Sequence, residues 1–387
     1  MELLNNDQLK ELLALRKGLH KNPELSGKEK NTSRKLEEFI RQTSPDKIIT
    51  GLGGYGVAAV YVFDEKGPTI LVRADMDALP IDEINTFAHK SENDGVSHKC
   101  GHDGHSTILS GLAIALKNNP LPKGRIVLLF QPEEETGQGA AKVIADEAFK
   151  MIKPDYAIAL HNLPGFEKGA IVLRDGPFAA ASTGMIVKIT GASSHAAHPE
   201  QGNSPVKMLA HAMQELPELP QKKSSKFKDF ALATIIHAKL GEVAFGTNPG
   251  KAVLMATLRT YYNDDMDVLV KEAERLVKSL AEEYKMQIEI SYTEEFPATI
   301  NDKSLNDIIR QVCEKTGQKT TEIEEPFRWS EDFGHFTSQF KATLFGVGSG
   351  KDSPGLHNND YDFPDEILPH AVQVFYNTLK KIVNYNH

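Results

Sequence analysis

The sequence predicts an α/β fold in which a catalytic domain with a mostly parallel central sheet flanked by helices carries an inserted, smaller α+β domain of ferredoxin-like type. Three observations predict this. The chain has 387 residues, more than one typical core uses. Short apolar runs alternate with helical patterns through most of the chain. Between about residues 181 and 293 the order changes to strand, helix, strand, strand, helix, strand.

The boundaries of the two domains follow from this change of pattern. We expect the catalytic domain to comprise residues 1–180 and 294–387, and the inserted domain to comprise residues 181–293. The last strand of the insert, at residues 287–292, alternates polar and apolar residues, which is typical of a sheet with one solvated face. Such an edge strand is available for pairing between subunits, and a homodimer through the inserted domain is a further expectation.

Four apolar runs are predicted to be buried strands, and each leads into acidic or histidine residues. The runs and the residues that follow them are 69–72 with Asp75 and Asp77, 125–130 with Glu133, Glu134 and Glu135, 156–160 with His161, and 342–347 with a glycine-rich loop that reaches His357. In open α/β sheets, ligands bind beyond the carboxyl ends of the strands. We therefore expect these polar residues to converge on one site.

Composition excludes several classes of partner. The formal charge of -9 is spread along the chain without a basic stripe, so nucleic acid is not expected as a partner. No stretch approaches the roughly 18 apolar residues of a membrane span, and the first residues resemble an amphipathic helix rather than a signal peptide. Only Cys100 and Cys313 occur, which suits a reducing compartment. The prediction is a cytoplasmic protein without membrane contact.

The segment from Ser97 to His105 concentrates one cysteine and three histidines before an amphipathic helix. In an extended backbone, residues i and i+2 point the same way, so Cys100 and His102 are expected to ligate one metal ion. The alternative is a capped helix start with an exposed histidine cluster. This segment alone leaves both interpretations open.

The acidic run Glu133 to Glu135 directly follows a predicted strand and precedes a glycine-rich turn. Adjacent carboxylates in an extended loop point to different sides, so one can bind a metal while its neighbour takes a proton from water. A solvated acidic loop is the alternative. Together with Cys100 and His102, the histidines at 161 and 357 and Glu135 make a ligand set.

The chain resembles the M20 family of metallopeptidases, in the branch of the aminoacylases and indole-acetyl-amino-acid hydrolases, over nearly its whole length. The matching stretches are Leu15-Arg16 through Leu19-His20 to Pro23-Glu24-Leu25, Arg73 to Pro80, Cys100 to His105, Phe130-Gln131-Pro132 with Glu134-Glu135, His161 with Pro164, Gly191 with His195-Ala196-Ala197 and Pro199, Ser330 to Phe333, and Leu356-His357.

The resemblance implies a role for each matching residue. The implied metal ligands are Cys100, His102, Glu135, His161 and His357. Glu134 is implied to be the general base, and His195, in the inserted domain, to stabilise the oxyanion, often across a dimer interface in this family. Arg259 keeps the family register. Asp75 and Asp77 are expected to orient the ligating imidazoles without contacting metal.

Two positions depart from the family pattern. Glu133 stands where the family usually has Ala, which adds a carboxylate beside the base. The Asn-x-x-Pro motif of the insert, which helps to hold the substrate, becomes Gly246-Thr247-Asn248-Pro249, so the family's Asn falls on Gly246. Asn248 is the remaining candidate for that contact.

We therefore expect an amidohydrolase or carboxypeptidase-like peptidase that cleaves the amide bond of N-acyl amino acids or small dipeptide-like substrates. Two divalent ions would activate the water, with Zn or Mn favoured and Co or Ni also suited to the ligands. Two alternatives belong to other classes. One is a small-molecule binding protein on the same fold that has lost turnover. The other is a thiol hydrolase with Cys100 as nucleophile and His102 or His105 as base.

Overall fold

A computed structural model of the chain describes residues 3–64 and 66–384, and it divides into two compact units. Unit 1 comprises Met1–Phe178, Thr299–Glu325 and Asp332–His387, and unit 2 comprises Ala179–Ala298 and Pro326–Glu331. The short segment from Pro326 to Glu331 thus groups with unit 2, although it follows the insert by nearly thirty residues in the chain. Each unit has its own apolar core.

The central sheet of unit 1 contains the four strands that the apolar runs predict. Its order is β1-β2-β4-β3-β5-β16-β6-β15. The bounds are β1 Lys47–Leu52, β2 Gly56–Asp64, β3 Thr69–Asp75, β4 Gly124–Gln131, β5 Tyr156–Pro164, β6 Ile171–Leu173, β15 Thr320–Glu322 and β16 Lys341–Gly350. The neighbours β4, β3, β5 and β16 are parallel, so their carboxyl ends share one edge. The predicted α/β fold class is confirmed.

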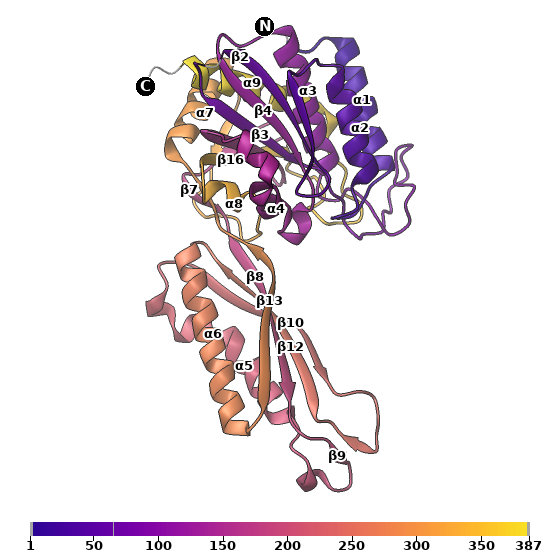
Figure 1. The fold of residues 1–387 in the computed structure, drawn as a ribbon, viewed down its shortest axis with the longest axis vertical. Coiled ribbons are helices and arrows are strands. Elements are labelled where there is room, and N and C mark those ends of the chain that lie inside the picture. Colours follow the sequence, from indigo (N-terminus) through magenta and orange to yellow (C-terminus); the bar gives the residue numbers. More distant parts are fainter. Residues whose placement is uncertain (1–2, 65, 385–387) are drawn as a thin grey trace. The chain divides into compact units, whose positions relative to one another are not determined.

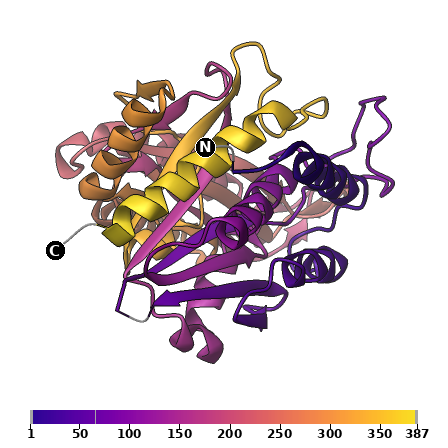
Figure 2. The ribbon, with the colours of Figure 1, turned by 90° about the horizontal axis from the view of Figure 1, so that it is seen from above.

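Helices flank this sheet, and the helices that begin at His102 and at Leu368 pack closely on one another (Figure 2). The helices of unit 1 are α1 Asn6–Lys21, α2 Lys30–Arg41, α3 His102–Asn118, α4 Gly139–Ala145, α7 Lys303–Thr316, α8 Gly334–Thr337 and α9 Leu368–Asn384. A Cβ atom added at Gly111 of α3 would lie 2.9 Å from Val372 Cγ2 on α9 and 3.1 Å from Leu12 Cδ1 on α1. The missing side chain therefore permits the close approach of α3 to its neighbours.

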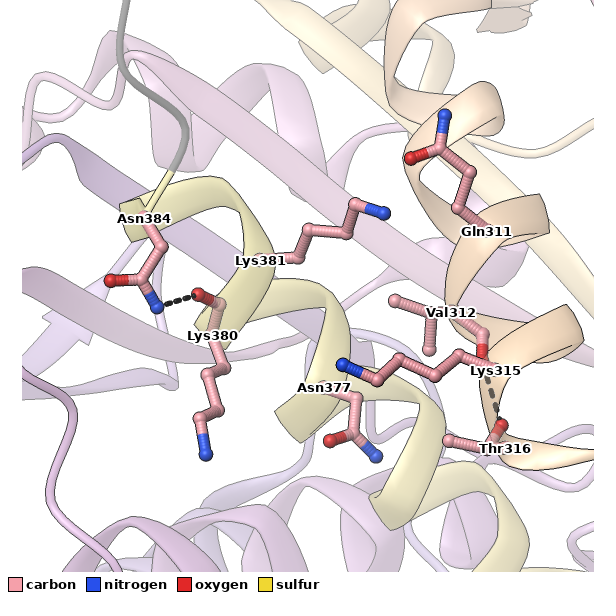
Figure 3. A pocket seen from close by; sticks show the side chains of 8 residues that line it. All are labelled: Gln311, Val312, Lys315, Thr316, Asn377, Lys380, Lys381 and Asn384. Atoms are coloured by element: carbon pink, nitrogen blue, oxygen red, sulfur yellow. Dashed lines mark hydrogen bonds between the residues drawn. The ribbon is translucent and has the colours of Figure 1, made fainter.

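A groove of about 590 Å³ lies between α7 and α9 (Figure 3). Its lining residues are Gln311, Val312, Lys315, Thr316, Asn377, Lys380, Lys381 and Asn384. None of them is a cysteine, histidine or carboxylate, so this groove is not where the metal-ligand residues gather. Among the helices within residues 3–64 and 66–384, none has the length and apolar character needed to cross a membrane.

Unit 2 has the strand and helix order that the sequence predicts for the insert. Its main elements are β8 Ala181–Thr190, α5 Val206–Lys222, β10 Ala231–Leu240, β12 Lys251–Thr260, α6 Asn263–Tyr284 and β13 Gln287–Phe296. The antiparallel sheet has the order β10-β12-β8-β13, and α5 and α6 cover one face of it (Figure 1). This is the ferredoxin-like arrangement. Two short strands, β9 Ser194–His195 and β11 Thr247–Asn248, form a separate ladder.

Replacing Gly111 with Leu should lower the free energy of unfolding by about 1–3 kcal/mol, because a larger side chain is forced between α3, α9 and α1. Urea denaturation followed by circular dichroism measures this change. Gly111→Ala is the matched control, since one methyl group requires only small shifts of the flexible ends of Leu12 and Val372. Equal stability of the Leu variant and the native protein would contradict this close packing.

Candidate metal centre

The ligand-type residues predicted from the strand ends form overlapping groups in unit 1. One group contains Cys100, His102 and His161, and a second contains Cys100, Glu135 and His357. Within each group the potential ligand atoms all lie within 4.8 Å of one another. A third group adds Glu134 to His102 and Glu135. Because the first two groups share Cys100, the arrangement fits two neighbouring metal ions.

The segment that carries Cys100 and His102 is not extended, so that part of the prediction was wrong. Gly101 has a φ of +96° and caps α3, which begins at His102. A Cβ atom at Gly101 would lie 2.6 Å from Asn162 Oδ1, so both the backbone conformation and the close approach require glycine here. The sharp turn at Gly101, rather than a strand, brings the Cys100 thiol and the His102 ring to the same group.

Hydrogen bonds orient the two buried imidazoles. His102 Nδ1 lies 3.0 Å from the carbonyl oxygen of Asp77, and His161 Nδ1 lies 2.8 Å from that of Asn162. A carbonyl oxygen only accepts, so each Nδ1 donates and each Nε2 keeps its lone pair in the neutral ring. His161 Nε2 faces Cys100 Sγ at 3.5 Å. Both rings therefore present a ligating nitrogen to the cluster.

Glu134 and Glu135 occupy a 3-10 turn, η1 Glu134–Thr136, rather than an extended loop. Glu133 before it has a φ of +56°, which turns the chain sharply at the end of β4. Glu134 Oε2 and Glu135 Oε1 lie 4.0 and 3.7 Å from His102 Nε2. The expectation that the two carboxylates point to different sides was wrong, because the turn brings both to the same imidazole.

The surroundings of two buried atoms indicate whether a cation fits this cluster. His102 Nε2 and Glu135 Oε1 have no hydrogen-bond partner within the described residues. Glu135 Oε1 lies 3.7 Å from the Nε2 atoms of both His102 and His357. Tetrahedral zinc with bonds of about 2.1 Å separates N and O ligands by about 3.4 Å, and S and N ligands by about 3.6 Å. The observed spacings are close to both, so the residues fit bound metal.

The charged groups of the cluster also favour a bound cation. Burial raises the pKa of Glu135 to about 8, although His102 opposes this effect. Burial works against the protonated form of His102, but Asp75 and the other carboxylates outweigh it and raise the pKa of His102 to about 10. Four carboxylates, those of Asp75, Asp77, Glu134 and Glu135, thus surround one imidazole. The raised pKa of His102 shows that these carboxylates stabilise a positive charge at its position.

Asp75 and Asp77 contact the histidines of the cluster, and Asp75 Oδ2 also lies 3.9 Å from His102 Nε2. Asp75 Oδ1 lies 2.6 Å from His105 Nδ1, and its Oδ2 lies 2.6 Å from Arg73 Nη1. Asp77 accepts hydrogen bonds from Ser26 Oγ at 2.7 Å and from the backbone N–H of Glu135 at 3.0 Å. Asp77 therefore links the metal-ligand candidates Glu135 and His102 to each other.

Sequence reasoning assigned no role to a buried network behind Glu134. Arg73 donates to Asp332 Oδ1 at 2.6 Å and to Gln131 Oε1 at 2.8 Å, and Asp332 Oδ2 accepts from Gln131 and from the backbone of Ala140. The backbone N–H of Asp332 donates to Glu134 Oε1 at 3.2 Å. Arg73 and Asp332 each lie in a stretch that matches the family resemblance. Nothing in the sequence indicates that these two residues contact each other.

A second buried network holds the loop of Cys100 and His102 from both sides. Lys99 Nζ contacts Glu83 Oε1 at 2.5 Å, and His20 bridges Asp103 Oδ2 at 2.8 Å and Glu83 Oε1 at 3.0 Å. Burial opposes charge on His20, but Asp103 outweighs it and raises the pKa of His20 to about 9. Arg16 adds a contact of 3.2 Å to Asp103. The residues flanking the two candidate ligands are therefore fixed by ion pairs.

The three remaining predicted site residues belong to unit 2. His195 lies in β9, and its Nδ1 accepts a hydrogen bond of 3.0 Å from the N–H of Ala197. Asn248 Nδ2 donates to Ser194 Oγ at 3.1 Å, which ties β11 to the His195 segment. Arg259 Nη1 donates to the carbonyl of Arg328 and to Ser330 Oγ, both at 2.9 Å.

Two groups of contacts bear on the alternative functions. The carboxylate of Glu133, the unusual neighbour of the predicted base, contacts Lys142 Nζ at 2.5 Å instead of joining the His102 group. His105, one suggested base for a thiol nucleophile, has Nδ1 bonded to Asp75 and Nε2 in contact with Asn162. His161 rather than His105 therefore faces the Cys100 thiol.

The fold and the clustered ligand residues define a metal-binding hydrolase, and comparison with known proteins gives its family. Residues 71–381 match the model of a family described as Peptidase family M20/M25/M40. An uncharacterized hydrolase of Staphylococcus aureus is 31% identical over 378 residues, which are 94% of this chain and 96% of the relative. The chain belongs to the M20 family, as the sequence motifs predicted.

Two solved structures share the fold. A dinuclear metal binding peptidase of the M20 family from Bacillus subtilis superposes with a TM-score of 0.84 at 24% identity, covering 99% of this chain and 100% of that one. The aminobenzoyl-glutamate utilization protein of Klebsiella pneumoniae gives a TM-score of 0.73 at 20% identity, covering 98% and 97%. At these identities the likeness establishes the shared architecture.

Replacing Glu135 with Ala should reduce the content of bound divalent metal, because the variant loses an oxygen that lies 3.7 Å from two histidine nitrogens. Elemental analysis of protein loaded with Zn or Mn and then desalted measures this content, with up to two ions per chain expected in the native protein. Glu133→Gln is the matched control and should retain native metal content. Full occupancy in the Glu135 variant would contradict its assignment as a ligand.

Proposed function

We propose that this protein is a metal-dependent amidohydrolase that cleaves the amide bond of N-acyl amino acids or small dipeptide-like substrates. One observation carries the proposal: two adjacent carboxylates meet the same imidazole, and their surroundings differ. Within the described residues, Glu135 Oε1 is buried without a hydrogen-bond partner and lies 3.7 Å from two histidine nitrogens, whereas Glu134 Oε1 accepts a hydrogen bond from Asp332. One carboxylate suits a metal, and the other suits proton transfer.

The proposed ligands of two divalent ions are Cys100, His102, Glu135, His161 and His357. When bound, such ions polarise the amide carbonyl and lower the pKa of water. A thiolate ligand favours Zn, whereas the carboxylate and imidazoles also suit Mn, Co or Ni, so we propose Zn or Mn first. Thiolate ligation requires a reduced Cys100, which supports a cytoplasmic location.

Glu134 is the proposed general base. It is 5% exposed, so it is screened from bulk water but still reachable by a small substrate. The hydrogen bond from Asp332 fixes Oε1, which leaves Oε2 as the oxygen on the side of His102, 4.0 Å away. In the proposed reaction Glu134 takes a proton from the attacking water and delivers it to the leaving amine. The Arg73 and Asp332 network supports this role because it holds the Glu134 carboxylate in place.

His195 is the proposed donor to the oxyanion. Its Nδ1 accepts a hydrogen bond from Ala197, so the proton of the neutral ring is on Nε2. An exposed Nε2–H can donate to the negative oxygen that forms when water attacks the amide. The loop that carries it is stabilised by the Asn248 contact to Ser194, which gives Asn248 a positioning role.

Distances within unit 2 support action across a dimer. His195 pairs with Thr247, just before β12 begins at Lys251, whereas Arg259 is near the other end of that strand. At about 3.3 Å per residue, Arg259 is about 26 Å from Lys251. We propose that Arg259, like His195, contacts the substrate. One copy of unit 2 cannot bring both residues to one small substrate, but two copies can. We therefore propose a homodimer formed through unit 2, with the edge strand β13 as its pairing element.

Replacing Glu134 with Gln should lower kcat by about a hundredfold or more, because a general base contributes roughly 10²–10⁴-fold. The measurement is hydrolysis of a panel of N-acyl amino acids by Zn- or Mn-loaded protein, with metal content determined in parallel. Glu133→Gln is the matched control with near-native turnover, since that carboxylate contacts Lys142. If metal content falls together with turnover in the Glu134 variant, Glu134 is a ligand instead.

Replacing His195 with Ala should lower kcat by about 10²–10³-fold, as expected for a lost oxyanion donor, with native metal content. His198→Ala is the matched control, because His198 is an exposed histidine of the same segment. Mixing the His195→Ala and Glu134→Gln proteins tests the dimer. Action in trans restores one intact site in each heterodimer, whereas no recovery after demonstrated subunit exchange would place His195 in its own chain's site.

A further inference from the structure

The loop between β10 and β11 carries two fully exposed apolar side chains. Val243 is 98% and Phe245 is 100% exposed, and they are the most exposed large apolar residues in the part of the chain that the structure describes. Exposed apolar groups that gather at one place mark a site of contact with another molecule or ligand. The remaining residues of the loop give no cover, since a Cβ atom added at Gly246 would meet nothing within 4 Å.

This loop is bonded directly to the His195 segment. The N–H of Ala196 donates to the carbonyl of Gly246 at 3.0 Å, and Thr247 is paired with His195 in the β9 and β11 ladder. The N–H of Thr247 also donates to the carbonyl of Ala244 at 3.1 Å, which closes a turn around Phe245. Phe245 and His195 are therefore parts of one small structure and reach any ligand together.

The base of the loop is also fixed. Gly241 has a φ of +55°, and its N–H donates to the carbonyl of Lys251 at 2.9 Å. Phe245 is two residues from Thr247, and Thr247 is paired with His195. Backbone spacings put the Cα atoms of Phe245 and His195 at most about 13 Å apart. A phenylalanine side chain is long enough to extend over part of that distance.

We propose that Phe245 is a specificity residue that contacts the acyl group of the substrate, and that the preferred substrates carry an aromatic or long aliphatic acyl group. This inference rests on the proposed function. The oxyanion to which His195 donates forms on the acyl carbonyl, and the acyl chain is attached to that same carbon. The scissile nitrogen is attached to this carbon as well, but the amino acid beyond it carries a charged carboxylate, so an apolar ring near His195 suits the acyl group better. Contact with an apolar chain removes the exposed ring from water.

Phe245→Ala tests the inference when kcat/KM is measured for one amino acid acylated with acetyl, octanoyl or benzoyl. The expected result is a loss of about tenfold or more for the octanoyl and benzoyl substrates, with less than threefold change for the acetyl substrate. Phe245→Leu should restore most of the octanoyl activity. Ile236→Ala is the matched control, because Ile236 is also exposed, at 61%, but lies on β10 outside the loop. It should leave all three values unchanged.

Metal content, sedimentation and binding to phosphatidylglycerol vesicles are measured for each variant. An equal effect of Phe245→Ala on all three substrates, or no effect, overturns the inference while the proposed function stands. A loss of dimer or of vesicle binding in Phe245→Ala, without a change in acyl preference, also overturns it and assigns the ring to a subunit or membrane contact. Hydrolysis of no substrate by the metal-loaded native protein overturns the proposed function and this inference with it.

Discussion

The buried ion pairs of the Arg73 guanidinium are the interactions on which unit 1 depends most. The side chain of Arg73 is fully excluded from solvent and contacts Asp75, at the end of its own strand, and Asp332, which is 259 residues away in the chain. Removing one partner of a buried ion pair typically costs about 3–5 kcal/mol, because the other charge is left uncompensated. Arg73 therefore ties the carboxyl end of β3 to the segment before α8.

Asp75 and Asp332 each contact a residue of the candidate site as well as Arg73. Asp75 holds the His105 ring, and the backbone of Asp332 donates to Glu134. Glu134 Oε2, which lies 4.0 Å from His102 Nε2, is thus positioned through the contact of Glu134 Oε1 with Asp332. Precise placement of a base matters because proton transfer requires hydrogen-bond reach. The same buried cation also partly offsets the surplus of carboxylates around His102, which on their own would repel one another.

Unit 2 is stabilised in a different way from unit 1. Its sheet has helices on one face, and the candidate residues His195 and Asn248 lie in the short β9 and β11 ladder at one end of β12. This ladder has little apolar core of its own and is held by backbone hydrogen bonds and the Asn248 side chain. The exposed His195 of this ladder and the exposed Phe245 of the adjoining loop are therefore available to contact another molecule. The candidate metal cluster of unit 1, in contrast, is largely buried apart from the half-exposed His357 and is held by hydrogen bonds within the unit.

The sequence by itself determined the fold class, the central strands and the residue types of the metal cluster. Apolar runs of strand length report burial on both faces, and polar residues directly after them report the shared edge of a parallel sheet. Only the tertiary structure decided how those residues face one another. The left-handed Gly101 and the 3-10 turn at Glu134 replaced the extended segments that were expected. Arg73 and Asp332 were both visible in matching stretches, yet their contact was not, because a pairing across 259 residues depends on chain topology, which local sequence patterns do not encode.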